Sequence, residues 1–230
     1  MSSRVVRWSP EDGPAALVAG RLCAEHRGDR IDVRDPELAE ALAVSGARAI
    51  RRSLLMARPV PGAPGGPDAH ALAPPGIEIS AMVDDPARYA GALVRAFPPE
   101  HPDFDPDIAD AAAGRRALRS YFDGEVIGPW IASASAEARV TAGDAVGGIV
   151  VSRMPPHDSQ PERCWITEVF VEPSYHGRGI GRALLDHALT RLGEMGEAAL
   201  WLAVQVDNPA RRLYERTGFT TDSSWTRFQL

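Results

Sequence analysis

The sequence predicts an α/β fold built on a mixed, mostly antiparallel sheet flanked by helices. Short extended apolar runs alternate with stretches in which apolar residues repeat at the period of a helix. Within residues 166–192, an apolar extended run passes through three glycines in five residues directly into such a helix. A shorter version of the same element order occupies the front of the chain. These observations predict a large α/β domain preceded by a small α/β segment.

Composition and charge exclude several classes of function. The 230 residues are 44% hydrophobic and 24% charged, which is typical of a globular protein. The 25 basic and 31 acidic side chains give a formal net charge of -6. Because nucleic-acid binding depends on cationic contacts to phosphates, we expect no nucleic-acid partner. Every basic residue is arginine, so no chemistry that requires a lysine is available.

The sequence offers no membrane, secretion or metal signal. No apolar run approaches the roughly 20 residues of a membrane helix, and the first residues lack the apolar centre of a signal peptide. We therefore expect a cytoplasmic protein without a membrane partner. Cys23 and Cys164 lie far apart, without the close Cys/His spacing of a metal site, and we expect two buried thiols and no metal.

A stretch rich in proline and glycine, residues 59–76, predicts a linker between a segment at 1–58 and a domain at 77–230. The domain's expected elements, in order, are a strand at 76–82, a helix at 84–98 capped by Asp84 or Asp85, an acidic loop at 99–110, a helix at 113–122, a hairpin of 128–140 with 145–154, a strand at 164–173, the helix after the glycines, a strand at 198–206, a short helix at 209–218 and an extended end at 219–230.

The glycine-rich turn predicts a binding site for an anion. The first N–H groups of a helix have no partner within the helix, and the helix dipole adds partial positive charge there. Glycine permits positive φ and lets a phosphate approach the main chain. A P-loop is excluded because Arg182 and Ala183 replace its Lys and Ser/Thr, and the G-x-G-x-G spacing differs from the dinucleotide fingerprint. A tight turn that binds nothing is the alternative.

Two linked motifs resemble the GNAT family of acyl-CoA-dependent N-acetyltransferases, over about residues 77–230. The family's Gln/Arg-x-x-Gly-x-Gly/Ala motif is matched by HGRGIG at residues 176–181, directly after VFVEP, although His176 replaces the usual Gln or Arg. The second match, VQVDNPARRLYERTGF, follows about 30 residues later, as it does in the family. The resemblance implies a GNAT-like fold and transfer of an acetyl group from acetyl-CoA to a primary amine of a small molecule or peptide.

The resemblance also implies which residues hold the acetyl donor. Main-chain groups at the end of the strand would hold the pantetheine arm, and N–H groups of the turn would hold the pyrophosphate, while a family asparagine contacts the pantetheine. The matching residues are Phe170, Val171, His176, Gly177, Arg178, Gly179, Ile180, Gly181 and Asn208. Asp207 could take the place of Asn208, or Asn208 could simply cap the following helix.

Two further residues match the family's catalytic positions. Tyr214 would protonate the leaving thiolate, and its alternative role is that of a core aromatic on the inner helix face. Glu168 would take the proton that the attacking ammonium must lose, and its alternative role is that of a surface glutamate. The rival function for the whole chain is a catalytically silent acyl-CoA-binding module, which needs neither side chain.

Two further regions are the acidic loop and the front segment. The acidic loop would attract a cationic amine or merely be solvated; its carboxylates are Glu100, Asp103, Asp105, Asp107 and Asp110. Residues 31–58 parallel 204–230 in order and spacing, so residues 10–58 resemble a degenerate half of a second GNAT-like unit. This half lacks the glycine turn and is not expected to be catalytic. It is too small to close a core alone, so we expect it to dock on the main domain or on a second copy of the chain.

Overall fold

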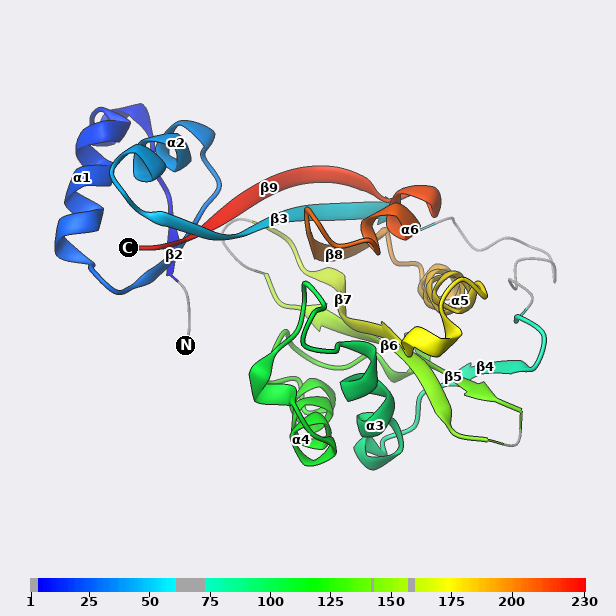
Figure 1. Ribbon diagram of the computed structural model, residues 1–230. Helices are drawn as coiled ribbons and strands as arrows, with labels where there is room; N and C mark the ends of the chain where they lie inside the picture. The colour runs from blue at the N-terminus through cyan, green and yellow to red at the C-terminus, as the bar shows by residue number, and fades with distance from the viewer. Residues whose placement is uncertain (1–3, 61–72, 142, 157–159) are drawn as a thin grey trace. The chain divides into compact units, whose positions relative to one another are not determined.

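The computed structural model describes residues 4–60, 73–141, 143–156 and 160–230 (Figure 1). Most of the predicted linker, residues 61–72, lies outside the described residues. The contacts divide the chain into two units. The first contains the front segment up to Met56 together with Ala203–Arg211 and Thr221–Leu230, and the second contains Ala57–Leu202 and Arg212–Thr220. The predicted α/β class with a mixed sheet is confirmed.

The sheet of the second unit runs in the order β8-β7-β6-β5-β4. Neighbours are antiparallel from β4 to β7, and β7 and β8 are parallel. The strands are β4 (Ile77–Ala81), β5 (Ala136–Val140), β6 (Ala145–Met154), β7 (Arg163–Val171) and β8 (Ala199–Gln205). The helices of this unit are α3 (Pro86–Ala96), α4 (Ala111–Phe122), α5 (Ile180–Glu194) and, apart from its first residue, α6 (Arg211–Arg216).

Helices cover both faces of this sheet. All eight residues from Ala145 to Ser152 of β6 are buried, which requires a layer on either side. In Figure 1, α3 and α4 lie on one face and α5 lies on the other. The α3–α4 layer encloses a core that includes Tyr89, Leu118 and Phe170. This layer includes α4 and the acidic loop before it, whose side chains enter the description of the candidate site below.

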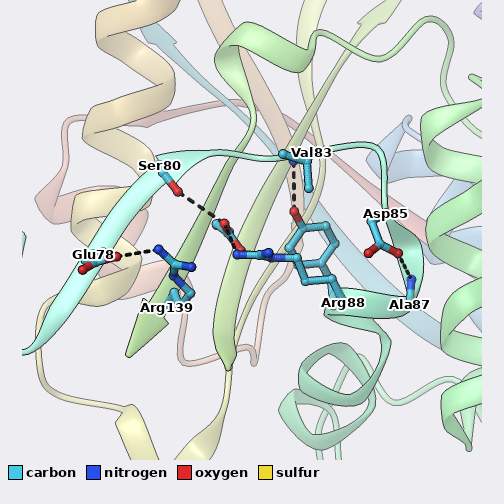
Figure 2. Close-up of polar contacts among 9 residues, drawn as sticks. Glu78, Ser80, Val83, Asp85, Ala87, Arg88 and Arg139 are labelled. Atoms are coloured by element: carbon cyan, nitrogen blue, oxygen red, sulfur yellow. Dashed lines mark hydrogen bonds and ion pairs between the residues drawn. The ribbon is translucent and has the colours of Figure 1, made fainter. Parts of the chain in front are cut away.

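Polar contacts fix the start of α3 to the sheet (Figure 2). Asp85 caps the helix by accepting the N–H of Ala87, and the Tyr89 hydroxyl accepts the N–H of Val83 at 2.9 Å. The Arg88 guanidinium donates two hydrogen bonds of 2.7 Å to Glu137 of β5, whose carboxylate is almost fully buried. A buried carboxylate requires such pairing, because the charge loses its hydration.

One predicted strand is shorter than expected. The sequence predicts an extended stretch over 128–140, but Ala132–Ala134 form a 3₁₀ turn and the strand begins at Ala136. The Ser135 hydroxyl accepts the N–H of Val151 at 2.9 Å and the indole N–H of Trp130 at 2.8 Å. This hydroxyl takes the place of a backbone partner and ends the strand pairing locally.

The first unit combines both ends of the chain. Its strands β1 (Arg4–Val6), β2 (Arg30–Val33), β9 (Thr220–Gln229) and β3 (Arg48–Pro59) are neighbours in that order. Its helices are α1 (Ala15–Glu25) and α2 (Pro36–Val44). Strand β1 was not predicted. The succession α1-β2-α2-β3 repeats that of α5-β8-α6-β9, as the half repeat requires, while the equivalence of the two segments remains a prediction.

The last strand completes the core of the front segment. Phe228 packs in one cluster with Ile31, Leu38 and Leu42, and all four are at most 2% exposed. On the same pair of strands, Arg227 donates two hydrogen bonds of 2.7 Å to Asp32, its cross-strand partner. The front segment is therefore not self-sufficient, since the far end of the chain supplies part of its core. Among the described residues, no helix has the length and apolar character needed to cross a membrane.

The Arg88–Glu137 pair allows a matched test of its contribution to stability. We expect Arg88→Met to lower the free energy of unfolding by about 3 kcal/mol, because it leaves the Glu137 carboxylate buried without its cation. Arg139→Met is the control: it breaks the 2.6 Å pair with Glu78, which is more exposed, and should cost less than about 1 kcal/mol. Urea unfolding of the two variants measures both values. Equal losses would contradict the role of burial.

Candidate active site

The backbone of the turn between β7 and α5 requires glycine at two positions. Gly177 and Gly179 have φ of 75° and 85°, in the region that other residues avoid. Among the described residues, a Cβ at Gly177 would meet no atom within 4 Å, and one at Gly179 would meet only Pro74, at 3.9 Å. Within this part of the chain, the turn is therefore open on the side where these side chains would stand.

Helix α5 begins at Ile180, with Gly179 as its N-cap. No acidic residue lies in its first turn, and no side chain in the described part of the chain caps this end, so no described side chain accepts from its first N–H groups. Gly181 has a different reason to be glycine: a Cβ there would lie 2.9 Å from a methyl group of Leu213. The last glycine thus permits close packing of α6, and the first two shape the turn.

His176 and Arg178 lie on the same turn and make different contacts. The Nε2 atom of His176 is 2.8 Å from the carbonyl oxygen of Val171, so the ring ties the turn back to the end of β7. The Arg178 guanidinium lies over the Tyr175 ring, 4.9 Å from its centroid, and is exposed. Arg178 therefore offers a cation beside the turn, whereas the contact of His176 is structural.

Strand β7 has one partner along its length and another only at its start. It pairs with β6 from Arg163 to Val171, but with β8 only at Cys164–Leu200 and Trp165–Trp201. Beyond Trp165, its second edge has no strand partner among the described residues. Phe170 is 2% exposed and belongs to the core, so only its main chain is available at this edge. An extended ligand with amide groups could hydrogen-bond there as a strand would.

A β-bulge precedes Glu168. Val150 is paired with Glu168 but Val151 is paired with Ile166, so Thr167 is an extra residue on β7. Its hydroxyl donates to Ser152 at 2.7 Å, which holds the bulge in place. Bulges change the direction of the side chains next to them and are common beside active sites.

Glu168 lies among protein atoms yet keeps partial access to solvent. The N–H of Val169 donates to its Oε1 at 3.1 Å, and the Tyr121 hydroxyl donates to its Oε2 at 3.4 Å. Burial raises the pKa of Glu168 to about 8, and the negative charge of Asp103 adds to this, while the two donors oppose it. A carboxylate that gains a proton near neutral pH is suited to general-base chemistry.

Tyr214 of α6 is 6% exposed and packs edge to face on Phe219, with ring centroids 5.8 Å apart. Burial raises its pKa well above the usual value, and the charges of Glu168 and Asp103 add to this. The phenol is therefore neutral at working pH. Among the described residues its hydroxyl has no hydrogen-bond partner. Tyr214 is thus a core aromatic with an available hydroxyl, and its role as the acid remains a prediction.

Asn208 lies in the first unit, in the turn before α6. Its Oδ1 accepts the N–H of Ala210 at 2.7 Å, and the residue is 6% exposed. This contact lies within the turn that precedes α6, which begins at Arg211, so it does not cap the helix. Its contact with an acetyl donor remains a prediction.

Much of the acidic loop serves local structure. Asp105 accepts the N–H of Asp107 at the start of a 3₁₀ turn, and Asp110 caps α4 by accepting the N–H of Ala113. Asp103 is different, since its charge raises the pKa of both Glu168 and Tyr214. Any attraction of this loop for a cationic amine remains a prediction. No group of three or more metal-ligating side chains occurs in the described part of the chain.

The sequence analysis missed Tyr121. This tyrosine, near the end of α4, is 47 positions from Glu168 in the sequence, and nothing in its local pattern distinguishes it from other residues of an amphipathic helix. Only the packing of α4 over β7 brings the two side chains together.

Comparison with known proteins gives one family and several relatives. The profile of the Acetyltransferase (GNAT) family matches residues 92–219, more than half of the chain. A mycothiol acetyltransferase of Propionibacterium freudenreichii is 31% identical over 180 residues, which cover 78% of this chain and 53% of the relative. The [ribosomal protein bS18]-alanine N-acetyltransferase of Escherichia coli is 46% identical over 52 residues, 22% of this chain and 35% of the relative. The chain thus spans about half the length of the mycothiol acetyltransferase and about a third of the length of the Escherichia coli enzyme.

Solved structures share the fold at low sequence identity. A GCN5-related N-acetyltransferase from Sphaerobacter thermophilus has a TM-score of 0.60 at 20% identity, covering 89% of this chain and 60% of its own. A tandem GNAT protein from the clavulanic acid biosynthesis pathway has a TM-score of 0.61 at 17% identity, covering 93% and 68%. Both similarities concern the fold alone.

The raised pKa of Glu168 predicts a pH-dependent stability. A carboxyl whose pKa rises from 4.5 to about 8 on folding stabilises the folded state at low pH, and this contribution is lost as pH rises through 8. Between pH 6 and pH 9, the wild type should therefore lose about 3 kcal/mol relative to Glu168→Gln, which cannot titrate. Urea unfolding of both proteins at the two pH values measures the difference. Parallel pH dependences would show that the carboxyl titrates normally.

Proposed function

Because the chain belongs to the GNAT acetyltransferase family, we propose that it transfers an acetyl group from acetyl-CoA to a primary amine of a small molecule or peptide. The observation that carries the proposal is the conjunction, on one strand, of an unpaired edge, a glycine turn at its end and Glu168 beside a bulge. A turn that merely connected β7 to α5 would need neither the unpaired edge nor Glu168 beside a bulge.

The residues of the second unit fit an acyl-CoA. The turn at Gly177 and Gly179 is open, and the uncapped N-terminus of α5 offers N–H groups to a pyrophosphate. Arg178 adds an exposed cation beside these groups. The free edge of β7 after Trp165 suits the amides of a pantetheine arm. Acetyl-CoA supplies the activated acetyl thioester when bound.

Glu168 and Tyr214 are proposed to move the two protons of the reaction. An alkylammonium with a pKa on the order of 10 must lose a proton before it can attack, and the Glu168 carboxylate would receive it. The new bond joins the amine nitrogen to the acetyl carbon, the nitrogen releases its second proton to solvent, and the carbon–sulfur bond breaks. Glu168 later returns its own proton to solvent. The neutral Tyr214 phenol would donate its proton to the departing thiolate and later regain one from solvent. Main-chain N–H groups of β7 are the proposed donors to the carbonyl oxygen.

The acceptor is proposed only as a class. The names of the two relatives specify mycothiol and a ribosomal-protein alanine, so the family admits both small molecules and peptides. Asp103 and Glu168 favour an amine that arrives as a cation. Release of CoA in the presence of a panel of small amines and peptides with free amino termini tests the proposal. Binding of acetyl-CoA without turnover of any amine would point to a silent acyl-CoA-binding module.

The glycine turn can be tested by calorimetry. We expect Gly179→Asp to weaken acetyl-CoA binding at least tenfold, about 1.4 kcal/mol, because it places a carboxylate where the pyrophosphate would bind. Gly196→Asp is the matched control: Gly196 follows the other end of α5, has φ of 75° and also faces open space. It carries the same backbone strain and charge and should bind normally. Equal affinity in both variants would remove the turn from the donor site.

Tyr214→Phe separates the catalytic from the packing role of this residue. The ring and its contact with Phe219 are kept, so we expect acetyl-CoA binding and KM to change little. We expect kcat to fall by roughly 10², the lower end of what general acid catalysis contributes. Steady-state kinetics with the best amine of the panel gives both constants. A kcat within about threefold of the wild type would mean that solvent protonates the thiolate.

A further inference from the structure

We propose that Tyr121 of α4 is a positioning residue that holds the Glu168 carboxylate in the orientation needed to accept a proton from the amine. The inference deepens the proposed function and rests on it, since it concerns the same site. Tyr121 contacts neither substrate in this proposal. It acts through Glu168, by a hydrogen bond from its hydroxyl.

The contacts of Glu168 show how its orientation is fixed. Each carboxylate oxygen receives one donor: the N–H of Val169 lies 3.1 Å from Oε1, and the Tyr121 hydroxyl lies 3.4 Å from Oε2. Two donors on different oxygens define the plane of the carboxylate. One donor is main chain and would remain in any variant, so Tyr121 is the contact on which the orientation depends. Each oxygen keeps a further lone pair that can accept a proton from an amine.

Both partners are attached to the same packed core. Asp110 caps α4 at its start, and Leu118 and Phe122, on either side of Tyr121, are buried in the cluster that contains Phe170. Phe170 lies two residues after Glu168 and so points to the same face of β7. Phe122 also stacks on Trp130, with ring centroids 4.3 Å apart. The hydroxyl and the carboxylate are therefore held by side chains that cannot move independently.

The charges around the pair give Tyr121 an electrostatic role as well. From the loop before α4, Asp103 opposes ionisation of Glu168, and Asp105 acts in the same direction on Tyr121. From α6, Tyr214 is a neutral phenol whose pKa the charge of Glu168 raises. Among the described side chains that shift the pKa of Glu168, Tyr121 alone lowers it. Burial and Glu168 raise the pKa of Tyr121 itself, so its hydroxyl stays a donor throughout the working range.

The test is a titration of Glu168 in the free protein, without either substrate. In protein with ¹³C-labelled glutamate carboxyls, the Glu168 signal is identified by its absence in Glu168→Gln. We expect Tyr121→Phe to raise this pKa by at least about half a unit, because the charged form loses a donor. Site-specific difluorotyrosine at position 121, with a more acidic hydroxyl and nearly the same shape, should lower it. This second variant keeps the test decisive if the phenylalanine variant folds poorly.

Tyr89→Phe is the matched control. Tyr89 belongs to the same core cluster and its hydroxyl also makes one hydrogen bond, to the N–H of Val83. Its loss should reduce stability but leave the Glu168 titration unchanged. A shift of equal size in Tyr89→Phe, or no shift in either Tyr121 variant, would overturn the inference.

Kinetics distinguishes this inference from the proposed function. With an active amine, the acidic limb of the kcat/KM profile should move upward in Tyr121→Phe by the shift seen in the titration. The double variant with Glu168→Gln should be no slower than Glu168→Gln alone, since Tyr121 acts only through Glu168. A double variant at least tenfold slower would overturn the positioning role. If the wild type acetylates no amine, the proposed function fails, while the titration still decides whether Tyr121 controls the carboxylate.

Discussion

The incomplete pairing of β7 is the constraint on which the candidate site depends. The strand is held by β6 throughout but by β8 only at Cys164 and Trp165. Backbone N–H and C=O groups need partners, so an edge without a neighbouring strand is a place where an extended ligand can bind. The bulge at Thr167, the Glu168 carboxylate and the glycine turn all follow within this unpaired stretch or directly after it. One strand thus carries, in sequence, the edge, the carboxylate and the turn for which we propose the roles of binding edge, base and anion site.

The candidate site places a buried carboxylate, Glu168, against the packed α3–α4 layer. Glu168 gains a proton more readily than an exposed carboxyl, because burial and Asp103 disfavour its charge, and this reduces stability at high pH. Glu137 shows the opposite arrangement: it is also buried, but Arg88 pairs with it in two hydrogen bonds. The paired carboxylate anchors α3 to the sheet. Glu168 has no cationic partner among the described residues, and its role as a base is our proposal. The same α3–α4 layer serves both.

The first unit shows how the two ends of the chain depend on each other. Phe228, almost the last residue, fills a core whose other members come from the front segment. The Asp32–Arg227 pair joins the same two strands by charge. A half repeat that lacks a complete core can persist if another part of the chain supplies the missing strand, which agrees with the element order α1-β2-α2-β3. The glycine turn, Glu168 and Tyr214 all lie in the second unit.

The sequence by itself determined the α/β class, the order of nearly all helices and strands, and the family. These follow from local signals: apolar periodicity, caps such as Asp85 and Asp110, and glycines that a turn with positive φ requires. It also singled out Glu168 and Tyr214, through motif positions. Tertiary structure alone decided their surroundings. Four contacts depend on which surfaces meet after folding. They are the hydrogen bond from Tyr121 to Glu168, the packing of Gly181 against Leu213, the contact of His176 with the Val171 carbonyl, and the packing of Phe228 with the front segment. Local pattern specifies which face of an element is buried, but it does not specify the atoms that this face will meet.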